Sequence, residues 1–251
     1  MCSGWDYLPR LVTIASPAAC RLNGGVILAR AQTPAGEVVL RRRDTVVELV
    51  VNGVFAMDSA EVSSELALAD AAGSPPGRVL VGGLGLGYTA TRLLDAGAER
   101  VRVVELAEPL LNWARAGLTP ELARLASDPR VELVAGDIAE EVDGTWDAIL
   151  LDVDNGPTFL IHDQNRRVYA EDFLRTGLRA LTDGGRLVVW CETESPELAA
   201  TLERIADTVE LITVPVTRQG RSFDYALYRA HPSTEGHPKR RGLHPGMEPS
   251  T

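Results

Sequence analysis

The sequence predicts an α/β protein with a doubly wound, mostly parallel sheet of seven strands and a small N-terminal β-hairpin domain. Three observations carry this prediction. Short apolar strands alternate with helical segments from residue 78 onward, and β-branched runs separated by turn residues precede them. The run Ala148–Leu151 is entirely apolar, as expected of a central strand that helices cover on both faces.

The elements follow in order along the chain. The N-terminal runs, expected to pair as hairpins, are Gly25–Ala31, Glu37–Arg42 and Thr45–Val51. A helix over Asp58–Ala72, capped by Asp58 or Ser59, ends before the breaker cluster Gly73–Gly77. The main sheet is predicted at Arg78–Val81, Val101–Glu105, Val131–Ala135, Trp146–Asp152, Arg186–Cys191, Val209–Val214 and Phe223–Tyr228. Its helices are predicted at Tyr88–Ala96, Ala107–Leu118, Pro120–Ala126, Arg167–Leu181 and Ser195–Ala206.

These elements suggest three parts. We predict an N-terminal β domain over residues 1–57, a catalytic α/β domain over 58–230 and a disordered tail over 231–251. The tail is rich in Pro, Gly, His and charged residues and has no apolar periodicity. The length of 251 residues and a hydrophobic content of 45% suit one main domain with a small appendage.

Composition narrows the function classes. No apolar run is long enough for a membrane span, and residues 1–10 do not resemble a secretory signal. The cysteines Cys2, Cys20 and Cys191 are far apart and form no CxxC pair, so we expect a cytoplasmic protein without disulfides or a metal site. A formal charge of −10 argues against a general nucleic-acid binder, and we expect a small-molecule acceptor substrate as the partner.

A glycine-rich loop follows the first strand of the main sheet. Gly82, Gly83, Gly85 and Gly87 lie between that strand and a helix, where glycine lets the backbone turn tightly beside a ligand. Residues 83–87 read GxGxG, whereas dinucleotide-binding loops read GxGxxG. The spacing therefore favours a nucleoside cofactor without a pyrophosphate.

Two strand ends supply the rest of a nucleoside site. Glu105, followed by Leu106, ends the second strand, where a carboxylate can accept hydrogen bonds from both ribose hydroxyls. Asp137 follows the third strand and can accept from an adenine amino group, with Ile138 packing on the ring. Together, the glycine-rich loop, Glu105 and Asp137 predict the Rossmann-like fold of S-adenosylmethionine-dependent methyltransferases. The cofactor is expected to be S-adenosylmethionine or its decarboxylated form.

The fourth strand brings acids to the reactive end of this site. Asp152 and Asp154 follow it, and two close carboxylates raise the pKa of one, which makes it a usable base. Asp152 could instead be a counter-ion for the cofactor's amino group. His162, a second candidate base, and Tyr169 lie on the segment expected to cover the site. We predict Asp152, Asp154 and His162 as catalytic, and Asp154, His162 and Tyr169 as substrate-binding.

The chain resembles the spermidine synthase (polyamine aminopropyltransferase) family from about residue 46 to 229. The matching stretches are Val51–Asp58, Gly82–Gly87, Val104–Glu105, Gly136–Asp137, Asp152–Pro157 and Val168–Gly185. The resemblance implies the same fold, with a matching N-terminal β domain, and favours a homodimer.

The sequence departs from the family at residues that bind the donor's amine, that bind the polyamine and that supply the base. The family loop usually carries an Asp that grips the donor's amine, and Gly85 stands at that position here. A Tyr-His-Glu triplet of the family is replaced by Ser63-Ser64-Glu65, and the loop after Asp152 is shortened. These changes favour methyl transfer to a small-molecule amine or hydroxyl by in-line SN2 attack. Aminopropyl or aminocarboxypropyl transfer is the alternative, and a non-catalytic nucleoside-binding subunit is the second alternative.

Overall fold

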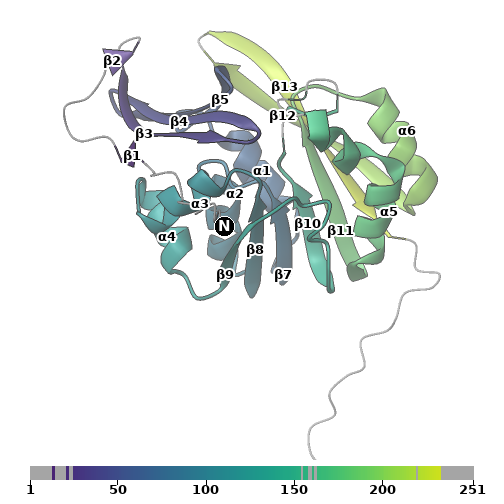
Figure 1. Cartoon of the computed structure of the whole chain (residues 1–251). Coiled ribbons are helices and arrows are strands. Elements are labelled where there is room, and N and C mark those ends of the chain that lie inside the picture. Colours follow the sequence, from purple (N-terminus) through teal and green to yellow (C-terminus); the bar gives the residue numbers. More distant parts are fainter. Residues whose placement is uncertain are drawn as a thin grey trace, which may run out of the picture.

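The computed structural model describes residues 13–14, 21–22, 25–153, 155–157, 160, 163–218 and 220–232, which form two sheets (Figure 1). The N-terminal sheet is antiparallel, with the order β1-β3-β4-β5-β6 and with β2 paired to β3. Its strands are β1 (Thr13–Ile14), β2 (Arg21–Leu22), β3 (Gly25–Thr33), β4 (Gly36–Arg43), β5 (Val46–Val51) and β6 (Val54–Asp58).

The second sheet has seven strands in the order β12-β13-β11-β10-β7-β8-β9. Five are parallel, and β13 and β12 join the edge antiparallel. They are β7 (Arg78–Gly82), β8 (Arg100–Glu105), β9 (Val131–Ala135), β10 (Trp146–Leu151), β11 (Leu181–Cys191), β12 (Thr208–Arg218) and β13 (Arg221–His231). The predicted fold class is confirmed: a doubly wound Rossmann-like sheet with a small antiparallel sheet before it.

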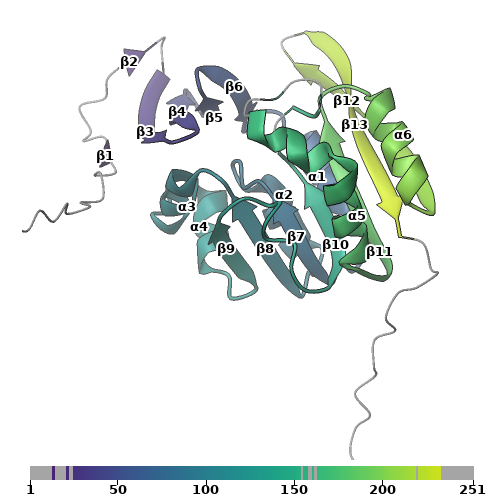
Figure 2. The ribbon, with the colours of Figure 1, turned by 45° about the vertical axis from the view of Figure 1, so that its right-hand side comes forward.

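Helices cover both faces of the main sheet (Figures 1 and 2). They are α1 (Ser63–Asp70), α2 (Tyr88–Asp95), α3 (Glu108–Arg115), α4 (Pro120–Ser127), η1 (Asp163–Tyr169, a 3-10 helix), α5 (Glu171–Arg179) and α6 (Pro196–Ile205). Side chains of β7 and β10 alternate between two cores: Val79 and Leu150 pack with α1–α4, whereas Leu80 and Ile149 pack with η1, α5 and α6. Among the described residues, no helix has the length and apolar character needed to cross a membrane.

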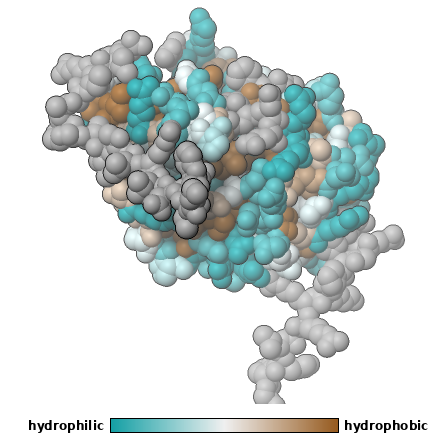
Figure 3. All heavy atoms as spheres, viewed as in Figure 1, coloured by the Kyte–Doolittle hydropathy of each residue, from teal (hydrophilic) through white to brown (hydrophobic). Residues whose placement is uncertain are grey.

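The N-terminal sheet lies over the carboxyl ends of the parallel strands (Figures 1 and 2). Its buried residues Ala29, Leu40 and Leu49 belong to the same core as α1–α4. The face shown in Figure 3 is mainly hydrophilic over its lower part and carries a hydrophobic patch at the upper left, where Figure 1 places the N-terminal strands. The two sheets therefore share one core. Because ligands of open α/β sheets bind outside the carboxyl ends of the strands, a ligand site is expected in the space between the two sheets.

Several predicted boundaries are wrong for local reasons. The predicted helix over Asp58–Ala72 begins only at Ser63, because Asp58 ends β6 and its carboxylate accepts from the N–H groups of Ala60 and Glu61 in a turn. The predicted cap Ser59 instead accepts from the N–H of Val47 in the neighbouring strand, at 2.9 Å.

The predicted helix Arg167–Leu181 divides at Ala170, whose backbone is extended. The 3-10 helix η1 precedes this residue, and α5 follows it. Leu181 already belongs to β11, since it pairs with Trp146 of β10. The division into three parts stays a prediction, and the proposed tail lies outside the described residues apart from His231 and Pro232.

Candidate active site

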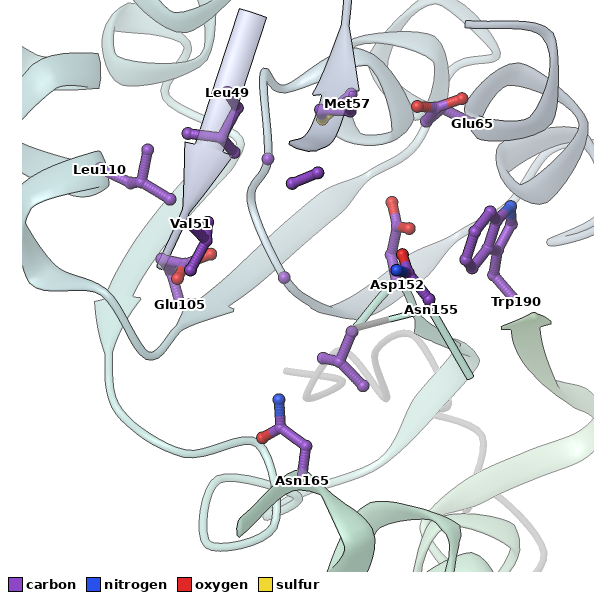
Figure 4. A pocket seen from close by; sticks show the side chains of 14 residues that line it. Leu49, Val51, Met57, Glu65, Glu105, Leu110, Asp152, Asn155, Asn165 and Trp190 are labelled. Carbon is purple, nitrogen blue, oxygen red and sulfur yellow. The ribbon is translucent and has the colours of Figure 1, made fainter. Parts of the chain in front are cut away.

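A cavity of about 160 Å³ lies between the N-terminal sheet and the carboxyl ends of the parallel strands. Its apolar wall includes Leu49, Val51 and Leu110, and three carboxylates from different elements reach it: Glu65, Glu105 and Asp152 (Figure 4). The lining contains no Lys or Arg among the described residues. The end that holds Leu49, Val51 and Leu110, the apolar end, has Glu105 as its one carboxylate among the described residues, whereas Glu65 and Asp152 lie together at the other, acidic end (Figure 4).

The glycine-rich loop forms one side of the cavity, and packing explains why it needs glycine. A Cβ on Gly83 would lie 2.1 Å from the carbonyl oxygen of Asp152. A Cβ on Gly85, at φ +52°, would lie 2.7 Å from the sulfur of Met57. The other two predicted glycines do not line the cavity: Gly82 packs under Ile138, and Gly87 packs against Leu125.

Replacing Gly85 by Ala should destabilise the protein more than replacing Gly97 by Ala. Both glycines have positive φ, but Gly97 has no atom within 4 Å of an added Cβ. The Gly97 variant therefore measures the backbone strain alone, about 1–2 kcal/mol, whereas the Gly85 variant adds the clash with Met57. Thermal unfolding of the two variants checks this. Equal losses of stability would show that the Met57 side chain moves away from the added Cβ without a measurable cost.

Glu105 is buried at the end of β8 and shapes the loop. Its Oε2 accepts from the N–H of Leu84 at 2.8 Å, and its Oε1 accepts from the N–H of Ala107 at 2.7 Å. Burial raises the pKa of Glu105, and the backbone N–H donors oppose this rise. A carboxylate has about four lone-pair sites, so with backbone donors at Leu84, Ala107 and Leu106 it keeps room for one more donor from a ligand. The next residue, Leu106, is half-buried and is not part of the cavity wall.

Asp152 lies directly after β10, at the acidic end of the cavity. Its Oδ2 accepts from the Thr89 hydroxyl in the first turn of α2 at 2.8 Å. Burial raises the pKa of Asp152 from 3.8 to about 7; the negative charge of Glu65 adds to the rise, and the Thr89 hydrogen bond opposes it. A carboxylate with this pKa can accept a proton at neutral pH, as a general base must.

Glu65 brings a further carboxylate from α1, and the sequence did not single it out as a site residue. The Ser64 hydroxyl donates to its Oε2 at 2.7 Å. Burial raises the pKa of Glu65, and the hydrogen bond from Ser64 opposes this rise. Figure 4 shows Glu65 and Asp152 at the same end of the cavity, near Trp190. A cation placed there would relieve the repulsion between two partly desolvated carboxylates.

Asp137 accepts hydrogen bonds from within the protein and does not line the cavity. Its Oδ1 accepts from the N–H of Ala139 at 2.8 Å, and its Oδ2 pairs with Arg167 of η1. Ile138 is buried against Gly82. Contact of Asp137 and Ile138 with an adenine ring stays a prediction.

Tyr169 is also buried, and its hydroxyl donates to the carbonyl of Val153, which ties η1 to the end of β10. The hydroxyl therefore already has a partner beside Asp152, and a role for it in substrate binding stays a prediction. The predicted catalytic residues Asp154 and His162 lie outside the described residues.

Sequence reasoning missed Met57 and Glu65, which line the cavity, and Thr89, which donates to Asp152, because the three come from different elements. Met57 comes from β6, Glu65 from α1 and Thr89 from α2. Glu65 did leave a sign in the sequence, since it keeps the glutamate of the Tyr-His-Glu triplet. Thr89 stands two residues after the last loop glycine, where a hydroxyl can face the strand ends.

Fold and cavity together define a Rossmann-like domain with a carboxylate-lined cavity at the carboxyl ends of its parallel strands. The chain belongs to the methyltransferase small domain family, whose model matches residues 46–216. It is 27% identical over 185 residues to the polyamine aminopropyltransferase of Corynebacterium efficiens. That alignment covers 70% of this chain and 35% of the relative, so the chain spans about a third of its length.

Solved structures show the same fold. The spermidine synthase from Thermotoga maritima has a TM-score of 0.66 at 20% identity, covering 81% of this chain and 72% of that one. A spermidine synthase in complex with the transition state analogue AdoDATO has a TM-score of 0.68 at 20% identity, covering 81% and 73%. The predicted resemblance to spermidine synthases is confirmed, and the named relatives are transferases, as the sequence predicted for this chain.

Proposed function

We propose that this protein transfers an aminopropyl group from decarboxylated S-adenosylmethionine to a small-molecule amine. The observation that carries the proposal is the charge of the cavity: its lining holds three carboxylates and, among the described residues, no Lys or Arg. Such a cavity favours a donor that carries only positive charge and disfavours the carboxylate of intact S-adenosylmethionine.

The residues present fit such a donor at both ends. At the apolar end, Glu105 offers a lone pair to a ribose hydroxyl beside Val51 and Leu110. At the acidic end, Asp152 and Glu65 would face the sulfonium and the amine. The name of the relative from Corynebacterium efficiens supports the same reaction class.

The reaction would depend on how the amine is positioned relative to the donor carbon and on one proton transfer, from the amine to Asp152. The donor supplies a carbon activated by the neighbouring sulfonium; a C–N bond forms there as the C–S bond breaks. The cavity holds the amine in line with that carbon, which is the main source of rate. Asp152 takes the proton that the attacking amine loses, and the Thr89 hydroxyl keeps its carboxylate oriented.

Methyl transfer from intact S-adenosylmethionine is the second candidate. The observation that favours it is Gly85, which leaves the loop without the carboxylate that the resemblance leads one to expect, under the side chain of Met57. The two reactions share the in-line geometry and the base and differ in the carbon that is attacked.

Calorimetric titration with the two donors separates these candidates. We expect decarboxylated S-adenosylmethionine to bind at least about tenfold more tightly, the size of one unfavourable charge contact of about 1.4 kcal/mol. Equal or tighter binding of intact S-adenosylmethionine would overturn the proposal in favour of methyl transfer. Incubation of the preferred donor with mixed amines then tests turnover. Tight binding without consumption would indicate a non-catalytic nucleoside-binding subunit.

A further inference from the structure

Four backbone N–H groups of the glycine-rich loop have acceptors inside the protein. Two donate to backbone carbonyls: Gly83 to Val104 at 2.8 Å and Gly87 to Leu84 at 2.9 Å. Leu84 donates to the carboxylate of Glu105. The N–H of Leu86 donates to the thioether sulfur of Met57 at 3.2 Å. A thioether is a weak acceptor, so Leu86 has the weakest partner of the four.

Met57 reaches the loop from the N-terminal sheet. It precedes the last residue of β6, lines the cavity and packs against the core that both sheets share. Its sulfur lies 2.7 Å from the position a Cβ of residue 85 would take. One side chain therefore covers both Gly85 and the N–H of Leu86, beside the acidic end of the cavity (Figure 4).

We propose that Met57 is a specificity-determining residue: its thioether covers the loop N–H group that a donor carboxylate would otherwise use. This inference rests on the proposed function, because it explains how the cavity prefers a donor without a carboxylate. A carboxylate is a much stronger acceptor of a backbone N–H than a thioether is. With Met57 in place, a donor carboxylate meets an apolar side chain on the loop side and Glu65 or Asp152 on the other.

Removal of the thioether tests this directly. In Met57→Ala the N–H of Leu86 is open to the cavity, and we expect the affinity ratio of intact to decarboxylated donor to rise about tenfold, the value of one hydrogen bond to a charged acceptor. Met57→Leu restores the cover without the sulfur and should leave the ratio near that of the wild type. Val51→Ala is the matched control, because it enlarges the apolar end without uncovering the loop.

Calorimetric titration of both donors against each variant gives the ratios, and thermal unfolding confirms that each variant is folded. If Met57→Ala does not fold, Met57→Val serves instead, since a β-branched residue suits a strand. The role of Met57 is overturned if the affinity ratio of intact to decarboxylated donor in Met57→Ala or Met57→Val stays within about twofold of the wild-type ratio. It is also overturned if Val51→Ala raises this ratio as much as the Met57 variant does. A wild-type preference for the intact donor overturns the proposed function, while the shift between variants still decides the role of Met57.

Discussion

Replacing Asp152 by Asn should lower kcat by about 10²–10⁴, the range in which a positioned general base contributes. The amide keeps the size of the side chain and can still accept from the Thr89 hydroxyl, but it cannot take the proton of the amine. Donor affinity should change little, because Glu65 remains at the same end of the cavity. A loss of donor affinity with kcat preserved would instead make Asp152 a counter-ion.

The pH profile of kcat/KM gives a second readout of the same role. A base works when it is deprotonated, so activity should fall as the pH drops below about 7, the pKa to which burial raises Asp152. Two neighbours should move this midpoint in opposite directions. Thr89→Ala removes a donor that lowers the pKa of Asp152 and should move the midpoint up. Glu65→Gln removes a charge that raises the pKa and should move it down. A midpoint that neither variant moves would exclude Asp152 as the titrating base.

The fold was predictable because its pattern is local. An apolar run such as Ala148–Leu151 indicates a strand buried on both faces, and a strand that leads into closely spaced glycines indicates a ligand loop. Element ends were less predictable, because tertiary partners decide them. Leu181 looks like a helix end in the sequence, yet it pairs with Trp146 across the sheet. Asp58 looks like a helix cap, yet its carboxylate closes a turn at the end of β6.

The site was predictable only where its residues follow strands of the main sheet. Glu105 and Asp152 could be inferred in this way, since the carboxyl ends of parallel strands meet at one edge. Met57 could not be inferred, because its contact with the loop depends on how the N-terminal sheet lies over the main sheet. For Asp137, the position after the third strand could be predicted. Its ion pair with Arg167 of η1 could not, because no sequence pattern indicates that partner.

Replacing Glu105 by Gln should weaken donor binding by about 100-fold, that is by about 2.7 kcal/mol. The carboxylate accepts from two backbone N–H groups at once, and an amide can accept with one oxygen only. One buried N–H would then face the amide's own NH₂ group and lose its acceptor, which costs about 1–3 kcal/mol. Because the N–H of Leu84 belongs to the glycine-rich loop, the loss should appear both as a lower melting temperature and as lower affinity.

The matched control is Glu108→Gln, the same substitution on an exposed residue in the first turn of α3. It should change neither donor affinity nor the melting temperature appreciably. At saturating donor the Glu105 variant should keep most of its kcat, since Asp152 and Thr89 are untouched. Glu105 would then act through binding and Asp152 through the chemical step, which is the division expected if the cavity has a nucleoside end and a reactive end. If the Glu105 variant binds the donor as tightly as the wild type does, then Glu105 does not contact the donor. Its carboxylate would then have only a structural role in the loop.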